Sequence, residues 1–348
     1  MKTILFCGGG SAGHVIPNIA LIEELKNNFN CIYIGTDGIE KNICKLNGVE
    51  LYECNTPKLV RGKIFCNLTL PLKLMTAVRR AGEILNEVKP DLVFSKGGYA
   101  CVPAVIAAKK SKIPVITHES DLEAGLATKF IARRCAKVLT SFPSTARKFG
   151  NGICTGSPMR KKLFNRNKGE AREQFGLDFR PTVLILGGGS GSKIINENVH
   201  KLADKICKDY NILHVCGKGN TVNSNIYGYK QIEFADDMGA VYACADAAVS
   251  RCGSNAAFEL LALKIPTIFI PLQNSASRGD QVKNAEYFKD AELCEIIYER
   301  NLNSENLYDG IKAILKNNKL KAALDKSDIK CGNENIINEI KRTIQRQF

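Results

Sequence analysis

Short apolar runs alternate with longer amphipathic segments along the chain, and this alternation restricts the fold more than any other feature. Brief β-rich runs between helical patterns are typical of parallel sheets with helices on both faces. The runs that predict strands are Thr3–Cys7, Cys31–Ile34, Leu92–Ser95, Pro114–Thr117, Val138–Thr140, Thr182–Leu186, Leu213–Cys216, Ala247–Ser250 and Thr267–Ile270. The segments that predict helices include Val15–Asn27, Cys101–Lys110, Ile194–Lys208, Ala256–Leu263, Gln281–Lys289 and Glu334–Arg346.

The strand series starts afresh near residue 181, and 348 residues exceed what one ordinary core holds. Gly156–Arg160, followed by the polar stretch Lys161–Gly169, is the best linker between the two series. We expect domains at 1–159 and 160–333, with the segment 334–348 packing back on the first. Each is predicted to be a doubly wound, Rossmann-like α/β unit. Since such sheets bind ligands at the carboxyl ends of their strands, two facing units would hold two ligands in one cleft.

The formal charge of +14 is concentrated in the first half, where residues 1–160 hold 22 Lys and Arg against 12 Asp and Glu. A positive field favours an anionic partner, which can be nucleic acid, a membrane surface or a phosphorylated substrate. Few aromatic residues are interleaved with the basic ones, which weakens the nucleic-acid interpretation because single-strand binding uses aromatic stacking. We therefore expect no nucleic-acid partner.

The 14 cysteines are scattered singly and none has CxxC spacing, so they predict small core residues in a reducing compartment. The apolar stretch Met1–Cys7 is too short for a secretory signal. No apolar run reaches the length that spans a bilayer, so any membrane contact is expected to be peripheral.

Three glycine-rich turns join a predicted strand to a predicted helix. They are Gly8–His14, Gly187–Ser192 and Ser95–Tyr99. Glycines let backbone N–H groups approach an anion, and the helix amino terminus adds a favourable dipole. A plain strand-to-helix turn explains the first equally well, and a close helix–strand approach explains the third better, but equivalent turns in both domains favour two phosphate sites. Lys96, in the third turn, would add a basic group beside an anion.

Two histidines and a carboxylate accompany these turns. His14 falls in the first helical turn, where an imidazole can take a proton from an attacking hydroxyl or make a structural hydrogen bond. His118 and Glu119 end another strand. Glu119 is a candidate base or acceptor-orienting group, and its structural alternative is a helix-capping residue.

Further carboxylates lie in the second half. Glu259, on the helix after Arg251–Ser254, can accept two ribose hydroxyls or be an ordinary surface charge. The pair Asp236 and Asp237 precedes a helical run, so an N-cap explains it better than a metal. The sequence predicts neither a metal site nor a cofactor.

The stretch Lys58–Leu85 interleaves basic and apolar side chains. That composition suits the interface of an anionic membrane, and it equally suits a helix packed on its sheet with solvated charges.

Together these motifs resemble glycosyltransferase family 28, in particular its lipid II-forming N-acetylglucosaminyltransferases, from Lys2 to about Ile297. The residues that carry the resemblance are Gly9–His14 with Pro17, Gly97–Tyr99, His118 and Glu119, Gly156–Arg160, Gly187–Asn196, Glu233–Met238, Arg251–Glu259, and Gln281 with Asn284 and Ala285.

The resemblance implies a GT-B fold and the inverting transfer of GlcNAc from UDP-GlcNAc to the muramyl 4-hydroxyl of lipid I, giving lipid II in peptidoglycan synthesis. It implies His14 and Glu119 as catalytic residues, with His14 the leading base. The donor residues that it implies are Ser11, Ala12, Gly13, Asp121, Arg160, Gly189, Ser190, Ala235, Ser254, Asn255, Ala256, Ala257, Phe258, Glu259 and Gln281. The acceptor residues are Gly10, Gly97, Gly98 and Tyr99.

The implied partners are UDP-GlcNAc, the undecaprenyl-pyrophosphate-linked acceptor and an anionic membrane surface, at the cytoplasmic face of the cell membrane. Three residues depart from the family pattern: Asp121 replaces a common Asn, Gly189 a usual Ser, and Ala12 a common Gly. The donor-sugar region Gln273–Asp280 also varies.

Three other functions compete. A UDP-GlcNAc 2-epimerase shares the fold and the nucleotide but needs no lipid acceptor. An NAD-dependent dehydrogenase on doubly wound domains is the second, for which Asp37, soon after the second strand, gives only weak support as a ribose partner. The third is a non-enzymatic basic membrane scaffold that has kept the fold.

Overall fold

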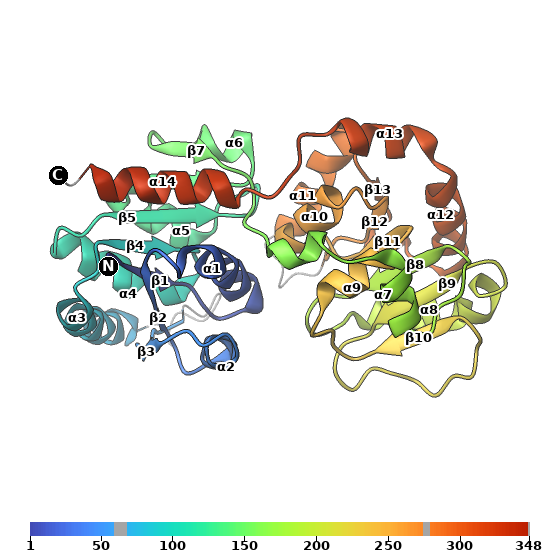
Figure 1. Cartoon of the computed structure of the whole chain (residues 1–348), viewed down its shortest axis with the longest axis horizontal. Helices are drawn as coiled ribbons and strands as arrows, with labels where there is room; N and C mark the ends of the chain where they lie inside the picture. The colour runs from blue at the N-terminus through green and yellow to red at the C-terminus, as the bar shows by residue number, and fades with distance from the viewer. Residues whose placement is uncertain (59–67, 274–278, 347–348) are drawn as a thin grey trace. The chain divides into compact units, whose positions relative to one another are not determined.

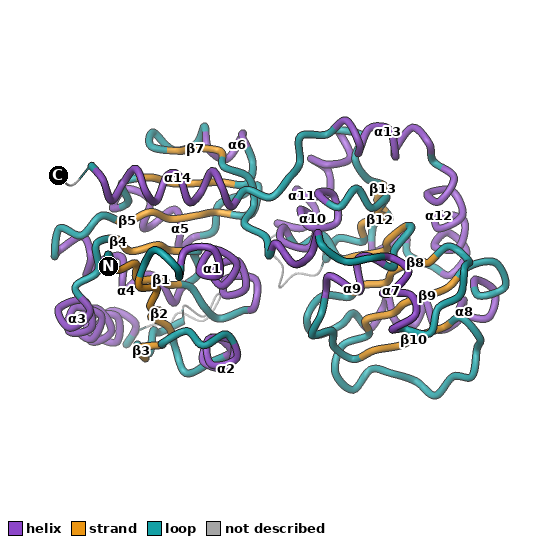
Figure 2. The backbone as a smooth tube through the Cα atoms, in the orientation of Figure 1, coloured by secondary structure: helices purple, strands orange, loops and turns teal. Residues whose placement is uncertain are grey.

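The computed structural model describes residues 1–58, 68–273 and 279–346. The chain divides into two compact units, Met1–Arg160 with Cys331–Phe348, and Lys161–Lys330. Each unit contains one parallel sheet surrounded by helices (Figures 1 and 2). This is the α/β architecture with two Rossmann-like sheets that the sequence predicts.

The sheet of unit 1 has seven strands in the order β3-β2-β1-β4-β5-β6-β7. Their bounds are β1 Thr3–Cys7, β2 Asn30–Gly35, β3 Leu51–Glu53, β4 Leu92–Ser95, β5 Val115–Glu119, β6 Lys137–Thr140 and β7 Gly152–Cys154. The helices are α1 Ala12–Leu25, α2 Ile39–Leu46, α3 Leu70–Val88, α4 Val102–Lys110, α5 Leu126–Ile131, α6 Pro143–Ala146 and α14 Asn333–Gln345.

Alternate strand residues of unit 1 point into two separate cores. On β1, Leu5 and Cys7 pack with α3 and α4, whereas Ile4 and Phe6 pack with α1 and α14. This alternation follows from the period of two in a strand, and both faces are apolar because helices cover both. The unit is therefore a three-layer sandwich.

The C-terminal helix α14 belongs to unit 1 by packing. Its residues Ile336 and Ile340 are fully buried in the same core as β1 and α1. Glu339 on this helix forms an ion pair with Lys137 on β6. Apolar burial and a charge pair thus bind the end of the chain to its first domain.

The sheet of unit 2 has six strands in the order β10-β9-β8-β11-β12-β13. Their bounds are β8 Thr182–Leu186, β9 Asn211–Val215, β10 Tyr229–Ile232, β11 Ala247–Ser250, β12 Thr267–Phe269 and β13 Glu295–Ile296. The helices are α7 Lys168–Gln174, α8 Lys193–Ile206, α9 Met238–Ala243, α10 Ser254–Ala262, α11 Asp280–Asp290, α12 Ser304–Lys316 and α13 Asn318–Lys326.

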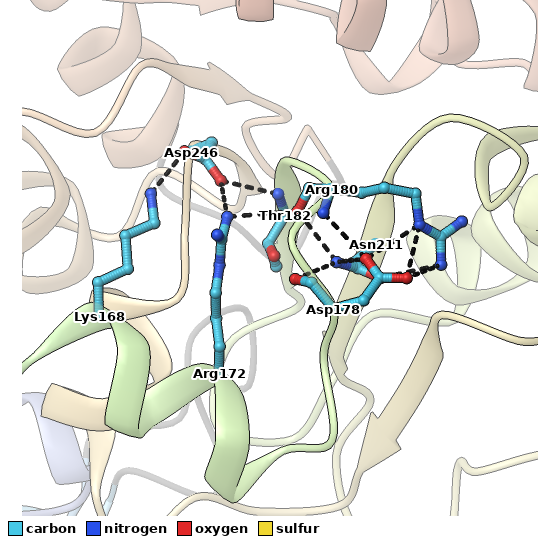
Figure 3. A network of polar contacts seen from close by, with 7 residues as sticks. All are labelled: Lys168, Arg172, Asp178, Arg180, Thr182, Asn211 and Asp246. Carbon is cyan, nitrogen blue, oxygen red and sulfur yellow. Dashed lines mark hydrogen bonds and ion pairs between the residues drawn. The ribbon is translucent and has the colours of Figure 1, made fainter.

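A polar network fixes the amino ends of the strands in unit 2 (Figure 3). Asp246, which precedes β11, accepts hydrogen bonds from Arg172 on α7 and from the backbone N–H of Thr182, both at 2.8 Å. Asp178 accepts from Arg180 and from Asn211 at the start of β9. The Arg180 guanidinium lowers the pKa of Asp178 well below its usual value. The network holds β8, β9 and β11 together at their amino ends, opposite the carboxyl ends where such sheets bind ligands.

The nine predicted strands are all present, with ends that differ by no more than two residues. The four strands that the sequence did not predict, β3, β7, β10 and β13, are the edge strands of the two sheets. Their residues are mostly half-buried or exposed, so they contain no continuous apolar run.

The cysteines are as the sequence predicts. None of the 13 described cysteines forms a disulfide, and ten of them are buried. Within the described ranges, no helix combines the length and apolar character needed to cross a membrane.

Candidate active site

The predicted glycine turns flank the point in each sheet where the strand order reverses. In unit 1 this point lies between β1 and β4, which are followed by the turns Gly8–His14 and Lys96–Tyr99. In unit 2 it lies between β8 and β11, which are followed by Gly187–Ser192 and Arg251–Glu259. Open α/β sheets bind ligands at this point, outside the carboxyl ends of the strands. Each unit thus has one ligand-binding edge.

The two glycine turns of unit 1 pack directly against each other. A Cβ at Gly98 would lie 3.1 Å from the carbonyl oxygen of Gly9 and 3.2 Å from the ring of His14. A Cβ at Gly10 would lie 2.5 Å from the ring of Tyr99. Gly10, Gly97 and Gly98 all have φ near +80°, which favours glycine. The structure thus brings the four predicted acceptor residues and His14 together.

His14 lies in the first turn of α1 and is half-buried. Its Nδ1 is 2.9 Å from Oγ of Ser11, the residue before the helix, whose side chain makes no capping hydrogen bond. In the tautomer whose Nδ1–H donates to this hydroxyl, Nε2 carries the lone pair of the ring. Ser11 is thus placed to orient the imidazole. Ala12 and Gly13, between Ser11 and His14 in the sequence, are the first two residues of α1.

Glu40 is a buried residue of this site that the sequence did not single out. Its carboxylate accepts hydrogen bonds from the N–H of Thr36 at 3.0 Å and from the N–H of Gly10 at 3.4 Å. A Cβ at Gly9 would lie 2.3 Å from this carboxylate. Glu40 therefore supports the first glycine turn from behind. Its position in α2 gives no local signal for that contact.

Glu119 ends β5 and is 8% exposed. One carboxylate oxygen accepts from the N–H of Asp121 at 3.1 Å, and the other accepts from the N–H of Gly125 at 3.0 Å. Both oxygens therefore organise the loop that leads to α5. Glu119 does not cap α5 itself, because the N-cap of that helix is Gly125.

His118 is fully buried, with Nε2 at 3.0 Å from the carbonyl oxygen of Gly156. Burial and the neighbouring Lys96 hold its pKa well below its ordinary value. The ring is therefore neutral at pH 7 and ties β5 to the segment before Arg160. Arg160 is half-buried and ends unit 1.

The crest of the glycine turn in unit 2 is open. A Cβ at Gly188 or Gly189 would meet no atom within 4 Å, and Ser190 is exposed. The base of the turn is closed instead, because a Cβ at Gly191 would lie 1.9 Å from the carbonyl oxygen of Cys216. The turn leads into α8, whose N-cap Ser192 makes no side-chain capping bond. These features suit an anion at the amino end of the helix.

Arg251 joins three strand ends of unit 2. Its guanidinium donates to Oγ of Ser192 at 2.8 Å, to the carbonyl oxygen of Ile270 at 3.0 Å and to Glu299 at 2.6 Å. The residue is 9% exposed. This buried ion pair fixes the glycine turn relative to the segments after β11 and β12.

The predicted donor residues Ser254 to Glu259 form the first turns of α10. Asn255 and Ala256 are half-buried, as is Glu259, whose carboxylate accepts from the hydroxyl of Tyr242 at 2.8 Å. The side chains of Ala257 and Phe258 are in the core, where Phe258 packs edge-on against Phe288. These two residues therefore offer a ligand their backbone rather than their side chains.

Two further predicted residues lie on the loops of unit 2. Ala235 lies between β10 and α9, two residues before Asp237, which caps α9 by accepting from the N–H groups of Gly239 and Ala240. Asp237 is thus an N-cap, as predicted. Gln281, on α11, accepts through Oε1 from the N–H of Leu272 at 3.1 Å. Of the region Gln273–Asp280, residues 274–278 lie outside the described part.

Two family models match the chain. The glycosyltransferase family 28 N-terminal domain covers residues 4–140 and the corresponding C-terminal domain covers 182–342. A relative from Clostridium perfringens (strain SM101 / Type A) is 43% identical over 349 residues, 98% of each chain. It is named UDP-N-acetylglucosamine--N-acetylmuramyl-(pentapeptide) pyrophosphoryl-undecaprenol N-acetylglucosamine transferase. A relative of the same name from Clostridium botulinum (strain Alaska E43 / Type E3) is 41% identical over 91% of this chain and 90% of its own.

Solved structures share the fold. The crystal structure of Acinetobacter baumannii MurG matches with a TM-score of 0.76 at 22% identity, over 98% of this chain and 100% of that one. The UDP-GlcNAc 2-epimerase from Neisseria meningitidis bound to UDP-GlcNAc matches with a TM-score of 0.71 at 16% identity, over the same shares. At these identities the likeness concerns the fold alone.

Proposed function

The chain belongs to glycosyltransferase family 28, and we propose that it transfers GlcNAc from UDP-GlcNAc to the muramyl 4-hydroxyl of undecaprenyl-pyrophosphoryl-N-acetylmuramyl-pentapeptide. The product is lipid II, the disaccharide precursor of peptidoglycan. The observation that carries this proposal is the pair of glycine turns at the switch points of both sheets, in a chain 43% identical over 98% of its length to a transferase of that name.

Unit 2 holds the donor in this proposal. The open crest Gly188–Ser190 and the amino end of α8 receive the diphosphate of UDP, and Glu259 on α10 receives the ribose hydroxyls. UDP leaves with additional negative charge, so backbone N–H groups aimed at it stabilise the transition state more than the ground state. Because Arg251 holds this turn in place through Ser192, its N–H groups are already oriented toward the leaving UDP before the reaction.

Unit 1 holds the acceptor. Its diphosphate lies against the turns Gly8–Gly10 and Gly97–Tyr99, where Lys58 adds positive charge with Nζ 5.9 Å from the centroid of the Tyr99 ring. Nε2 of His14 takes the proton from the 4-hydroxyl as that oxygen attacks the anomeric carbon opposite the leaving UDP. A single in-line displacement inverts the anomeric centre. The bond in the product is therefore β-1,4.

Glu119 serves this reaction indirectly. Both of its oxygens are bonded to backbone N–H groups, so it shapes the loop from Asp121 to Gly125. We assign it a positioning role, and His14 the role of base. The reaction needs neither a metal nor a cofactor in this proposal, since helix dipoles and N–H groups supply the positive potential that the leaving group requires.

The acceptor is a lipid, so the protein must work at a membrane surface. The helices α3, α4 and α5 lie on one face of the sheet of unit 1. Lys109, Lys129, Phe130, Arg133 and Arg134 line a hollow of about 620 Å³ on this face. The Arg134 guanidinium lies 4.6 Å above the ring of Phe130, which is 48% exposed.

Helix α3 adds exposed apolar side chains, Leu72 and Met75, to the same face. Of the segment Lys58–Leu85, residues 59–67 lie outside the described part. Basic groups with exposed apolar ones fit the interface of an anionic bilayer. We propose that this face binds the cytoplasmic leaflet peripherally. In vesicle sedimentation, Arg134→Glu with Phe130→Ser should lose binding to anionic vesicles, while Lys45→Glu on α2 should keep it.

Two assays separate the transferase from the epimerase that shares its fold. Wild-type protein with UDP-GlcNAc and a soluble lipid I analogue should release UDP in step with disaccharide formation. With UDP-GlcNAc alone it should produce no UDP-ManNAc. Formation of UDP-ManNAc without acceptor would show that the protein is an epimerase. Vesicle binding without any turnover would favour the membrane scaffold.

A further inference from the structure

Lys96 is a buried lysine behind the acceptor turns of unit 1. It follows β4 and is only 3% exposed. Its backbone N–H donates to the carbonyl oxygen of Cys7 at 2.9 Å, which joins the ends of β4 and β1. A Cβ at Gly8 would lie 3.2 Å from the Cβ of Lys96. The side chain therefore starts at the contact between the two glycine turns.

The ammonium group of Lys96 points to the end of β5. Its Nζ donates to Oγ of Ser120, itself buried. Ser120 lies between Glu119 and Asp121, and both carboxylates favour the charged form of Lys96. The third titratable neighbour is His118, which is neutral because of burial and of this charge. One buried cation thus links the acceptor turns with the segment Glu119–Asp121.

A buried ammonium is costly unless it is compensated. Burial lowers the pKa of Lys96 from 10.5 to about 8, and Glu119 and Asp121 counteract only part of that effect. Deprotonation of Lys96 would remove the buried positive charge that stabilises the carboxylates of Glu119 and Asp121. It would also remove the charge from the hydrogen bond to Ser120, and such bonds are stronger than neutral ones.

We propose that Lys96 is a positioning residue of the transfer reaction: its protonated ammonium holds the Glu119–Asp121 segment in place beside the glycine turns that receive the acceptor. This inference rests on the proposed function. The rate of transfer then depends on the protonation of Lys96, although this proton is not transferred to the substrate. Lys96 lies in unit 1, whereas the glycine turn that we propose for UDP lies in unit 2.

The test is the pH profile of kcat/KM for the lipid I analogue, measured at saturating UDP-GlcNAc. The wild-type profile should fall as the pH rises through about 8, the pKa of Lys96. Asp121→Asn removes a charge that raises this pKa, so the alkaline fall should move to lower pH. Lys96→Met should lower kcat/KM for the acceptor about tenfold at pH 7 and abolish the fall. Lys96→Arg, which stays charged, should restore part of the activity and keep it at alkaline pH.

Two controls make the outcome specific. Lys45→Met, at an exposed lysine on α2, should keep the wild-type profile. Calorimetric UDP affinity should be unchanged in Lys96→Met, Lys96→Arg and Lys45→Met, which separates a local effect from unfolding. The inference is overturned if the alkaline fall persists in Lys96→Met or stays in place in Asp121→Asn. If the wild type transfers no sugar at any pH, the proposed function fails instead.

Discussion

Gly98 lies so close to His14 that a Cβ at position 98 would come within 3.2 Å of the imidazole Nδ1 and Cε1. It would also lie 3.1 Å from the carbonyl oxygen of Gly9, and the φ of Gly98 is +78°. The backbone at Gly98 therefore packs directly against the imidazole of His14, the proposed base. Only a glycine at position 98 leaves room for both the imidazole of His14 and the carbonyl oxygen of Gly9.

Gly98→Ala should consequently displace His14 and lower kcat/KM for the acceptor roughly 100-fold, because small misplacements of a catalytic group are costly. Gly48→Ala is the matched control, since Gly48 also has positive φ, +63°, but a Cβ there meets nothing within 4 Å. Gly48→Ala should lose about 1 kcal/mol of stability through backbone strain. Gly98→Ala should lose more, because the φ of 78° and ψ of 165° at Gly98 belong to a region that is essentially restricted to glycine. Equal activity of the two would show that the contact between Gly98 and His14 has no role.

His14→Ala should lower kcat at least about 100-fold, the usual contribution of a general base, with little change in UDP affinity. Ser11→Ala should cost less, because it removes only the partner that orients Nδ1. Steady-state kinetics measures kcat, and a UDP titration measures the affinity for UDP. Near-normal turnover of His14→Ala would remove this residue as the base.

Asp246→Ala should destabilise unit 2 by about 2 kcal/mol, because Arg172 and the N–H of Thr182 lose their acceptor. The change lies at the amino ends of the strands, so UDP affinity measured below the unfolding temperature should stay at the wild-type value. Glu197→Ala breaks only the exposed pair with Lys193 and should change stability little. A loss of UDP affinity in Asp246→Ala would contradict the separation of the network from the site.

Acid should destabilise unit 2 through His214. This residue is fully buried between Asn196 and Tyr229, at 3.1 and 3.0 Å, and burial lowers its pKa from 6.5 to about 3. Below pH 6.5 the unfolded chain therefore binds a proton that the folded chain refuses. Stability should fall by up to about 1.4 kcal/mol per pH unit between pH 6.5 and 3. Thermal unfolding should show a shallower acid slope in His214→Phe, and an identical slope would assign the effect elsewhere.

The sequence predicted the interior of both sheets well and their edges poorly. β1, β4, β8 and β11 are buried on both faces, so each is a continuous apolar run with the predicted bounds. β3 and β13 are half-exposed, and nothing in their local composition distinguishes them from loops. Only pairing with a neighbouring strand makes them strands.

The same difference applies to the site. The glycine turns were predictable because the backbone conformation requires glycine and the turn follows a strand directly. The supports Glu40 and Arg251 were not predictable, since each acts on a turn distant in sequence. The packing of Phe258 against Phe288 was not predictable either, because the sequence does not show which face of its helix is buried.

The measurement that tests the central claim most directly is the anomeric configuration of the product made from UDP-GlcNAc and a lipid I analogue. Proton NMR of the isolated disaccharide reports both the linkage position and the configuration at the new bond. A single displacement with His14 as base predicts GlcNAc joined β-1,4 to the muramyl sugar, with one UDP released for each bond. An α-linked product, or no disaccharide while UDP-GlcNAc is consumed, would contradict the account.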